Sequence, residues 1–199
     1  MNEFEFITKI ASSLYTPYVL ENLPMTELRD ALSDGQVYSK LWLVHELRIL
    51  INSGQIRAEP KIAIVGGWIG TLALMIHQRM SAQVTSIDLD DRANKIAASI
   101  NDGYNITVVT ADMYDIDYSK FDVIINTSSE HIPNISSWRN SLPAGKIAIV
   151  QNTNYRDAEG HISCLEHIDQ LKKALALDIL FAGTYDLPIY KRFMVIGRT

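Results

Sequence analysis

The stretch from Lys61 to Gly70, KIAIVGGWIG, constrains the fold of this chain more than any other segment. An apolar run leads directly into three glycines within five positions, and a second apolar run from Ile69 to Arg79 is compatible with a helix. Glycine is favoured where the backbone adopts positive φ or where another group approaches closely. The pattern therefore predicts a strand, a tight turn and a helix, either with a ligand over the helix N-terminus or as a turn without a ligand.

A second strand and an acidic residue follow at the spacing found in nucleotide-binding α/β folds. The segment from Ala82 to Leu89 is strand-like and ends around Asp88, which follows the glycine turn by about 20 residues. A carboxylate at this position can accept hydrogen bonds from both hydroxyls of a ribose. Asp90 and Asp91 precede a run with helical spacing, so the acidic cluster could also serve only as a helix N-cap.

The order of the later segments predicts a mostly parallel sheet. Strand-like runs at residues 106–110, 121–126 and 145–151 alternate with helical stretches, which implies right-handed crossovers and helices on both faces. The last two strand-like runs, 178–187 and 192–197, are joined by so short a connection that they must be adjacent and antiparallel. We therefore predict an α/β fold with a Rossmann-like, mostly parallel seven-stranded sheet and a C-terminal antiparallel strand.

Length, charge and cysteine content indicate the number of domains, the kind of partner and the redox compartment. The chain has 199 residues, 47% of them hydrophobic, which suffices for one well-buried domain. Its net charge of −5 argues against a broad nucleic-acid footprint, although a local basic patch could still form. The single Cys164 excludes an internal disulfide and fits a reducing compartment. Without a membrane span or a basic signal segment, we expect a cytoplasmic protein.

A helical lead-in is expected before the sheet. Residues 1 to about 58 have helical spacing, and we divide the chain into a helical N-terminal extension at 1–55 and a Rossmann-like domain at 56–199. The lead-in could lie over the carboxyl edge of the sheet as a lid or form a wall of a substrate pocket. Tyr38 is a candidate substrate contact there, whereas packing against a helix face is the favoured interpretation for Trp42 and His45.

These features resemble the class I S-adenosylmethionine-dependent methyltransferases over about Ile56 to Thr199. The resemblance rests on the glycine turn, the acid after the second strand, Ala111-Asp112 after the third, Asp122 and Asn126 around the fourth, and the closing hairpin. It implies S-adenosylmethionine as the cofactor. The residues that it implies in cofactor binding are Gly66, Gly67, Trp68 and Gly70 at the methionine part, Asp88 at the ribose, Leu89, Asp112 and Met113 at the adenine, and Asn126.

Two positions depart from the pattern of that family. The family usually has an acid two residues before the first glycine, where this chain has Ile64, and a central glycine where it has Trp68. Trp68 would lie where the amino-acid end of the cofactor normally rests. The cofactor could take another pose, or the pocket could hold another nucleotide such as NAD, or none. Related folds also use the same cofactor to transfer an aminocarboxypropyl or aminopropyl group, or bind it without turnover.

The segment after the fourth strand, Asn126 to His131, is rich in groups that bind a substrate or move a proton. Open α/β sheets bind ligands at this edge, and the resemblance implies that these residues line the place where the methyl group leaves. Methyl transfer needs alignment and at most one base. Histidine titrates near neutral pH, so His131 is the candidate base, with Glu130 beside it to orient it or to bind a substrate ammonium. Alternatively, His131 only caps the turn before Pro133.

Two further segments bear on the substrate. After Asn126 the chain lacks both prolines and the aromatic of the Asn-Pro-Pro-aromatic motif of amino-methyltransferases, which weakens a nucleic-acid substrate. At the end of the fifth strand, Asn152 and Tyr155 are candidates for a polar substrate wall, or belong only to a turn. The histidines and acids near residues 161–169 match no familiar metal spacing, so no metal is expected.

The sequence thus predicts an enzyme that uses S-adenosylmethionine to methylate a small polar molecule, with His131 or Glu130 as the proton acceptor and Asn126 beside them. Two alternatives stay open: a transferase that moves an aminocarboxypropyl group, and a non-catalytic nucleotide-binding protein that uses its N-terminal helices as a partner surface. The acceptor and the oligomeric state are left open.

Overall fold

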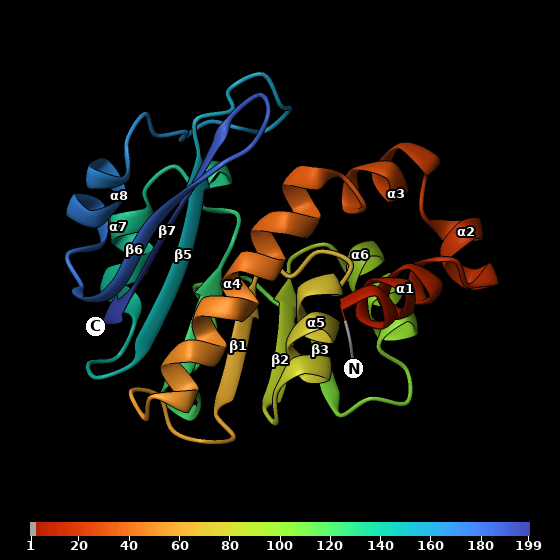
Figure 1. Cartoon of the computed structure of the whole chain (residues 1–199), viewed down its shortest axis with the longest axis horizontal. Coiled ribbons are helices and arrows are strands. Elements are labelled where there is room, and N and C mark those ends of the chain that lie inside the picture. Colours follow the sequence, from red (N-terminus) through yellow and green to blue (C-terminus); the bar gives the residue numbers. More distant parts are fainter. Residues whose placement is uncertain (1–2) are drawn as a thin grey trace.

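The computed structural model describes residues 3–199 and shows a central sheet with helices on both faces (Figure 1). Before the sheet come α1 (Glu3–Leu14), α2 (Pro17–Asn22), α3 (Met25–Ala31) and α4 (Asp34–Asn52). The strands are β1 (Lys61–Val65), β2 (Gln83–Asp88), β3 (Ile106–Thr110), β4 (Val123–Asn126), β5 (Ile147–Thr153), β6 (Asp178–Asp186) and β7 (Lys191–Arg198). Between them lie α5 (Thr71–Arg79), α6 (Asp91–Ile100), α7 (Ile135–Ser141), α8 (Ile168–Leu175) and the 3-10 turns η1 (Tyr118–Lys120) and η2 (Ser129–His131).

The sheet has the strand order β3-β2-β1-β4-β5-β7-β6. The strands β1 to β5 pair in parallel, and β7 runs antiparallel between β5 and β6. This confirms the predicted Rossmann-like sheet with its closing antiparallel hairpin. β5 extends further than expected, through Thr153, which pairs with Arg192 of β7. Because the strand order reverses beside β1, a crevice opens at the carboxyl ends of β1 and β4.

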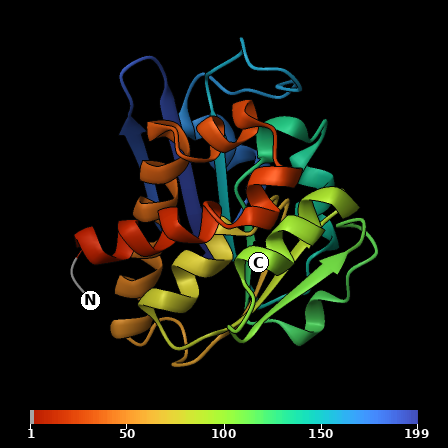
Figure 2. The same ribbon diagram turned by 90° about the vertical axis from the view of Figure 1, so that its right-hand side faces the viewer.

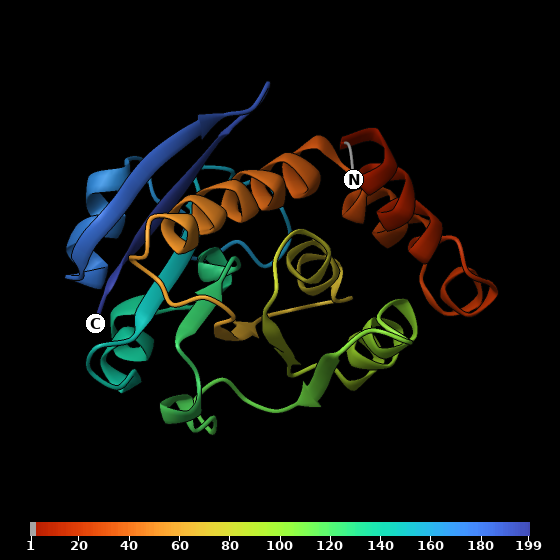
Figure 3. The ribbon, with the colours of Figure 1, turned by 60° about the horizontal axis from the view of Figure 1, so that its bottom comes forward.

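The buried strands divide the core into two clusters. On β1, Ile62 and Ile64 belong to the cluster under α4 and α5, whereas Ala63 and Val65 belong to the cluster under α7 and α8. Figure 3 shows these helices on opposite sides of the sheet. Since both faces are covered, the central strands are apolar throughout rather than alternating with polar residues.

The lead-in is helical, as predicted, and α4 covers one face of the sheet beside α5. Leu43 and Leu47 of α4 are fully buried in the same cluster as Ile62. Figure 2 shows α1 running across α5, which it contacts. Trp42 packs its ring centroid 6.0 Å from that of Phe181 on β6, in agreement with the packing interpretation. Within residues 3–199, no helix combines the length and apolar character needed to cross a membrane.

The start of α6 shows which acidic residue caps the helix and which one is left for ligand binding. Asp90 is the N-cap, because its Oδ1 accepts hydrogen bonds from the backbone N–H groups of Arg92 at 2.8 Å and Ala93 at 3.3 Å. Asp88 lies before the cap at the end of β2 and is therefore available for another role.

The glycine turn is held against the end of β2. The N–H of Gly67 donates to the carbonyl of Ile87 at 3.0 Å, and the N–H of Gly70 donates back to the carbonyl of Gly67 at 2.9 Å. A Cβ on Gly67 would lie 2.2 Å from Oγ of Ser86, so a side chain at position 67 would overlap this hydroxyl. Gly70 has a φ of 77° and is the N-cap of α5. The predicted strand, turn and helix are confirmed.

Gly67→Ala should lower the free energy of unfolding by about 1–3 kcal/mol, because the new methyl group overlaps the Ser86 hydroxyl. Ser86→Ala alone should be nearly neutral, since no described residue hydrogen-bonds this buried hydroxyl. The double variant should recover most of the loss, because Oγ is then gone and the other nearest atoms are 3.4 Å away. Urea unfolding of the three variants measures this, and an undiminished loss in the double variant would contradict the steric explanation.

Candidate functional site

A cavity of about 900 Å³ lies over the carboxyl ends of β1, β2 and β4, at the crevice that the strand order predicts. It brings together segments from the whole length of the chain. The lining includes Gly66, Gly67 and Trp68 of the glycine turn, Thr127, Ser128, Glu130 and His131 after β4, Thr153, Tyr155 and His161 at and after β5, residues 187–190 of the β6–β7 hairpin, and residues 33–36 at the start of α4.

The N-terminal helices form one wall of this cavity. Asp30 and Lys40 line it together with the start of α4. A Cβ on Gly35 would lie 1.7 Å from the hydroxyl oxygen of Tyr190, so α4 and the hairpin tip meet at this point with no room for a side chain. Of the two roles considered for the lead-in, the wall of a pocket is the one that this geometry matches.

The Asp88 carboxylate fixes the shape of the glycine turn. Its Oδ2 accepts the N–H of Trp68 at 2.7 Å, and its Oδ1 accepts the N–H of Asp90 at 3.0 Å. Trp68 has a φ of 47°, a left-handed conformation that a bulky residue keeps only when its surroundings hold it. A carboxylate has about four acceptor sites, so Asp88, which lines the cavity, can hold the turn and still accept a ligand hydroxyl.

Four other residues predicted to bind the cofactor are not part of the cavity wall. Leu89 is 71% exposed after β2, and Gly70 is the N-cap of α5. Asp112 is exposed after β3, where its Oδ1 accepts the N–H of Tyr114 at 2.9 Å. Met113 is partly buried next to it. These four residues do not line the cavity, and their contacts with a cofactor stay predictions.

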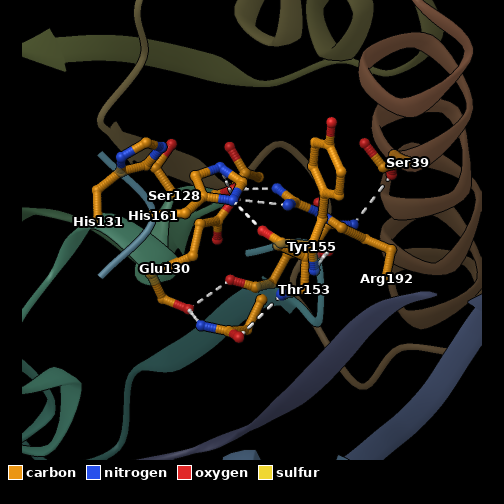
Figure 4. Close-up of polar contacts among 12 residues, drawn as sticks. Ser39, Ser128, Glu130, His131, Thr153, Tyr155, His161 and Arg192 are labelled. Atoms are coloured by element: carbon orange, nitrogen blue, oxygen red, sulfur yellow. Dashed lines mark hydrogen bonds and ion pairs between the residues drawn. The ribbon is translucent and has the colours of Figure 1, made fainter. Parts of the chain in front are cut away.

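A buried ion pair joins the segment after β4 to β7. Oε1 of Glu130 lies 2.6 Å from Nη1 of Arg192, and the two side chains are only 4% and 11% exposed. Arg192 also donates to the carbonyl of Thr127 through Nη2. Figure 4 shows the side chains of Glu130 and Arg192. Removing either member of such a pair would leave a buried charge uncompensated, so the pair sets the position of Glu130.

Two histidines meet beside this pair, as Figure 4 shows. His131 ends η2, and its ring lies 4.8 Å from that of His161 in an edge-to-face arrangement. Nδ1 of His131 lies 2.9 Å from the carbonyl of Gly160, and Nδ1 of His161 contacts the carbonyl of Tyr155. His131 is exposed, whereas the side chain of His161 is 12% exposed. Sequence spacing did not reveal His161 because its partner lies 30 positions earlier, after another strand.

Two asparagines that the sequence placed in the site form hydrogen bonds within and between loops instead. Asn126 is 2% exposed, and its Oδ1 accepts the N–H of Ser128 at 3.0 Å. Asn152 is 1% exposed, its amide nitrogen donates to Oγ of Ser129 at 2.8 Å, and its Oδ1 accepts the N–H of Leu165 at 3.0 Å. Neither amide lines the cavity. Their fixed geometry positions the segments that do line it.

Of the two tyrosines predicted to contact the substrate, only one lines the cavity. Tyr155 lines the cavity and stacks on Tyr190, with ring centroids 5.0 Å apart and planes inclined by 18°. Tyr38 is 46% exposed on α4 and does not line the cavity. His45 is also exposed on α4. Tyr38, Trp42 and His45 therefore do not line the cavity, whereas Lys40 on the same helix does.

Lys40 is a site residue that the sequence analysis missed. It is buried on α4, and its ammonium donates to the side-chain oxygen of Gln36. The pKa of Lys40 is lowered from 10.5 to about 7, first by burial and then by the nearby Arg192 guanidinium, while Asp30 acts in the opposite direction. The sequence places Lys40 on the same helical stripe as Leu43 and Leu47, which indicates burial but not its place at the cavity.

Comparison with known proteins gives similarity in fold. Neither protein-family models nor curated proteins match this chain. Among solved structures, magnesium protoporphyrin IX methyltransferase from Synechocystis PCC 6803 with bound SAH has a TM-score of 0.64 and 14% sequence identity, over 98% of this chain and 93% of that chain. The [4+2]-cyclase SpnF has a TM-score of 0.62 and 14% identity, over 78% of this chain and 81% of that chain.

A third similar structure is phosphoethanolamine N-methyltransferase 2 from Haemonchus contortus in complex with S-adenosyl-L-methionine. Its TM-score is 0.57 at 12% identity, over 86% of this chain and 59% of that chain. At these identities the likeness establishes the fold, and the site must be judged from its own residues.

The amine of Lys40 should titrate with a midpoint near pH 7, far below the ordinary lysine value of 10.5. Between these two pH values the folded chain binds fewer protons than the unfolded chain, so this group's contribution to stability rises with pH through that window. NMR of isotope-labelled lysine side chains, assigned with Lys40→Met, measures the midpoint. The variant should also show a flatter dependence of unfolding free energy on pH. A midpoint near 10.5 would overturn the prediction.

Proposed function

Starting from the fold of class I S-adenosylmethionine-dependent methyltransferases, we propose that the cavity binds S-adenosylmethionine and transfers its methyl group to a small polar molecule. The observation that carries this proposal is an acidic cavity built directly on the glycine turn. Gly66, Gly67, Trp68 and Asp88 share one cavity with the segment after β4, which holds Glu130 and His131. A cofactor on the turn would therefore face these candidate groups.

The charges around the cavity favour a cationic ligand. Among the residues that the structure describes, five carboxylates line the cavity, whereas its lysine and arginine side chains are Lys40 and Arg192. The acids are Asp30, Asp34, Asp88, Glu130 and Glu159. Arg192 is already paired with Glu130, and the lowered pKa of Lys40 reduces its charge near neutral pH. S-adenosylmethionine carries a sulfonium and an ammonium, whereas NAD carries an anionic pyrophosphate. The field of the cavity thus supports S-adenosylmethionine over NAD.

The N-terminal helices offer a replacement for the acid that β1 lacks. Ile64, at the position of the usual acid, lines the cavity and is only 1% exposed. Asp30 and Asp34 also line the cavity and come from the region of α3 and α4. We assign to them the pairing with the cofactor ammonium, while the indole of Trp68 forms the adjacent wall. This arrangement would explain how a site with Ile64 and Trp68 can still bind the cofactor.

In the transfer step, the protein's task is to align the acceptor and, where required, to remove one proton. His131 lines the cavity and is the assigned proton acceptor, while the paired Glu130 provides a fixed negative charge beside it. Asn126 supports this segment through its bond to the Ser128 N–H. Asn152, beneath Ser129, supports it from β5, and Tyr155 contributes a polar wall.

Trp68 keeps a second candidate reaction open. Its side chain lines the cavity where the amino-acid end of the cofactor would rest, so another pose could present a different carbon to the acceptor and transfer an aminocarboxypropyl group. The mass of the product distinguishes the two reactions. The acceptor gains a methyl group in the first reaction and the larger aminocarboxypropyl group in the second. A protein that binds the cofactor but yields no product with amines, phenols or carboxylates would instead match the non-catalytic alternative.

Calorimetry with S-adenosylmethionine, S-adenosylhomocysteine and NAD tests the binding step. We expect the first two to bind, NAD not to bind, and Asp88→Ala to lose binding. Asp34→Asn should weaken S-adenosylmethionine binding by about 10- to 150-fold, because a charge-assisted bond to the ammonium contributes about 1.5–3 kcal/mol. Asp178→Asn, at the exposed start of β6, is the control and should bind normally. If the folded wild type binds neither cofactor form, the proposal fails.

A further inference from the structure

We propose that Glu130, His131 and His161 form a binding site for a first-row divalent metal ion at the wall of the cavity. The three side chains each offer one ligand atom, and these atoms lie within 4.8 Å of one another. They come from two separate segments, η2 after β4 and the loop after β5. Two imidazoles and one carboxylate are a ligand set that Mn²⁺, Fe²⁺, Co²⁺ and Zn²⁺ accept.

The backbone orients both imidazoles as metal ligands are usually oriented. Nδ1 of His131 lies 2.9 Å from the carbonyl of Gly160, and Nδ1 of His161 contacts the carbonyl of Tyr155. A carbonyl can only accept, so in each ring Nδ1 carries a proton, and Nε2 of the neutral ring then presents a lone pair. Metal-binding histidines almost always donate the second ring N–H to a carbonyl or carboxylate in this way. The second shell of a metal site is thus in place for both rings.

Glu130 provides the independent observation that points to a ligand. Its Oε1 pairs with Arg192, but no described residue donates to Oε2, although the side chain is only 4% exposed. Oε1 also lies 4.0 Å from Nε2 of His161. When the His161 ring is neutral and protonated at Nδ1, the lone pair of Nε2 faces the Glu130 carboxylate. A cation between these two groups would stabilise this arrangement. A buried carboxylate oxygen without a donor is rare in folded proteins and calls for such a partner.

The geometry needs only a small closure to bind an ion. Bonds from zinc to nitrogen and carboxylate oxygen are about 2.0–2.2 Å, so adjacent ligand atoms must approach to about 3.5 Å. The separation of 4.0 Å between Nε2 of His161 and Oε1 of Glu130, the oxygen that also pairs with Arg192, is close to this value. His131 is exposed, so an ion can reach its ring from solvent. All three residues line the cavity, so the remaining coordination positions would face its interior.

A bound ion would also change how the methyl acceptor binds and loses its proton. An oxygen donor of the acceptor, such as a hydroxyl, could fill an open position, and the ion would then favour loss of its proton. The imidazoles would in that case act as ligands rather than as bases. This consequence rests on the proposed transfer reaction, whereas metal binding itself does not.

Cobalt titration of the chelator-treated chain, without a histidine tag and without S-adenosylmethionine, tests the site. We expect visible d–d absorption that saturates at one ion per chain and is removed by Zn²⁺. His131→Ala and His161→Ala should each weaken binding by about 100-fold or more, since loss of even a second-shell partner costs about 10- to 100-fold. His45→Ala removes an exposed histidine on α4 that does not line the cavity, and should bind Co²⁺ as the wild type does.

Glu130→Gln tests the carboxylate, with circular dichroism to confirm that the variant folds. Because this change also affects the Arg192 pair, the two histidine variants decide the outcome. Absence of cobalt binding at millimolar concentration, or equal binding by the double variant His131→Ala, His161→Ala, would overturn the metal site. Either result leaves S-adenosylmethionine binding to its own calorimetric test, so the two proposals can fail separately.

Discussion

The close contact between Gly67 and the end of β2 is the constraint on which the rest of the site depends. The absent side chain lets the turn come against Ser86, and the N–H groups of Gly67 and Trp68 then bond to Ile87 and Asp88. These bonds set the entry of α5 and keep Trp68 in a left-handed conformation. The floor of the cavity is therefore made of backbone that cannot move without breaking its pairing to β2.

A second fixed point closes the other side of the cavity. Arg192 at the start of β7 binds both Glu130 and the carbonyl of Thr127, so the antiparallel strand is tied to the segment after β4. The hairpin that β7 forms with β6 then stands against the start of α4, where Gly35 meets Tyr190. The buried ion pair contributes to geometry more than to stability, since desolvation offsets much of its attraction.

Carboxylate and imidazole side chains make up most of the ionisable lining of the cavity. Its carboxylates outnumber its basic side chains, and its lysine has a pKa lowered to about 7 by burial first of all. Such an environment suits cationic ligands, whether an organic sulfonium or a divalent ion. The two proposals occupy different parts of one cavity: the glycine turn with Asp88 for the cofactor, and the segments after β4 and β5 for the ion.

Local patterns in the sequence were enough to predict the sheet, the glycine turn, the acid at Asp88, the helical lead-in and the antiparallel ending, because each follows from neighbouring residues and short spacing. The same patterns did not separate Asn126 and Asn152, which hold loops, from residues that face the cavity. They also missed Lys40 and Arg192, and they set aside His161. Only the tertiary structure brings these residues together, because a contact across 30 to 150 positions leaves no local period or spacing in the chain. Burial and the pairing of charges, which decide what each side chain can do, are properties of that assembled arrangement.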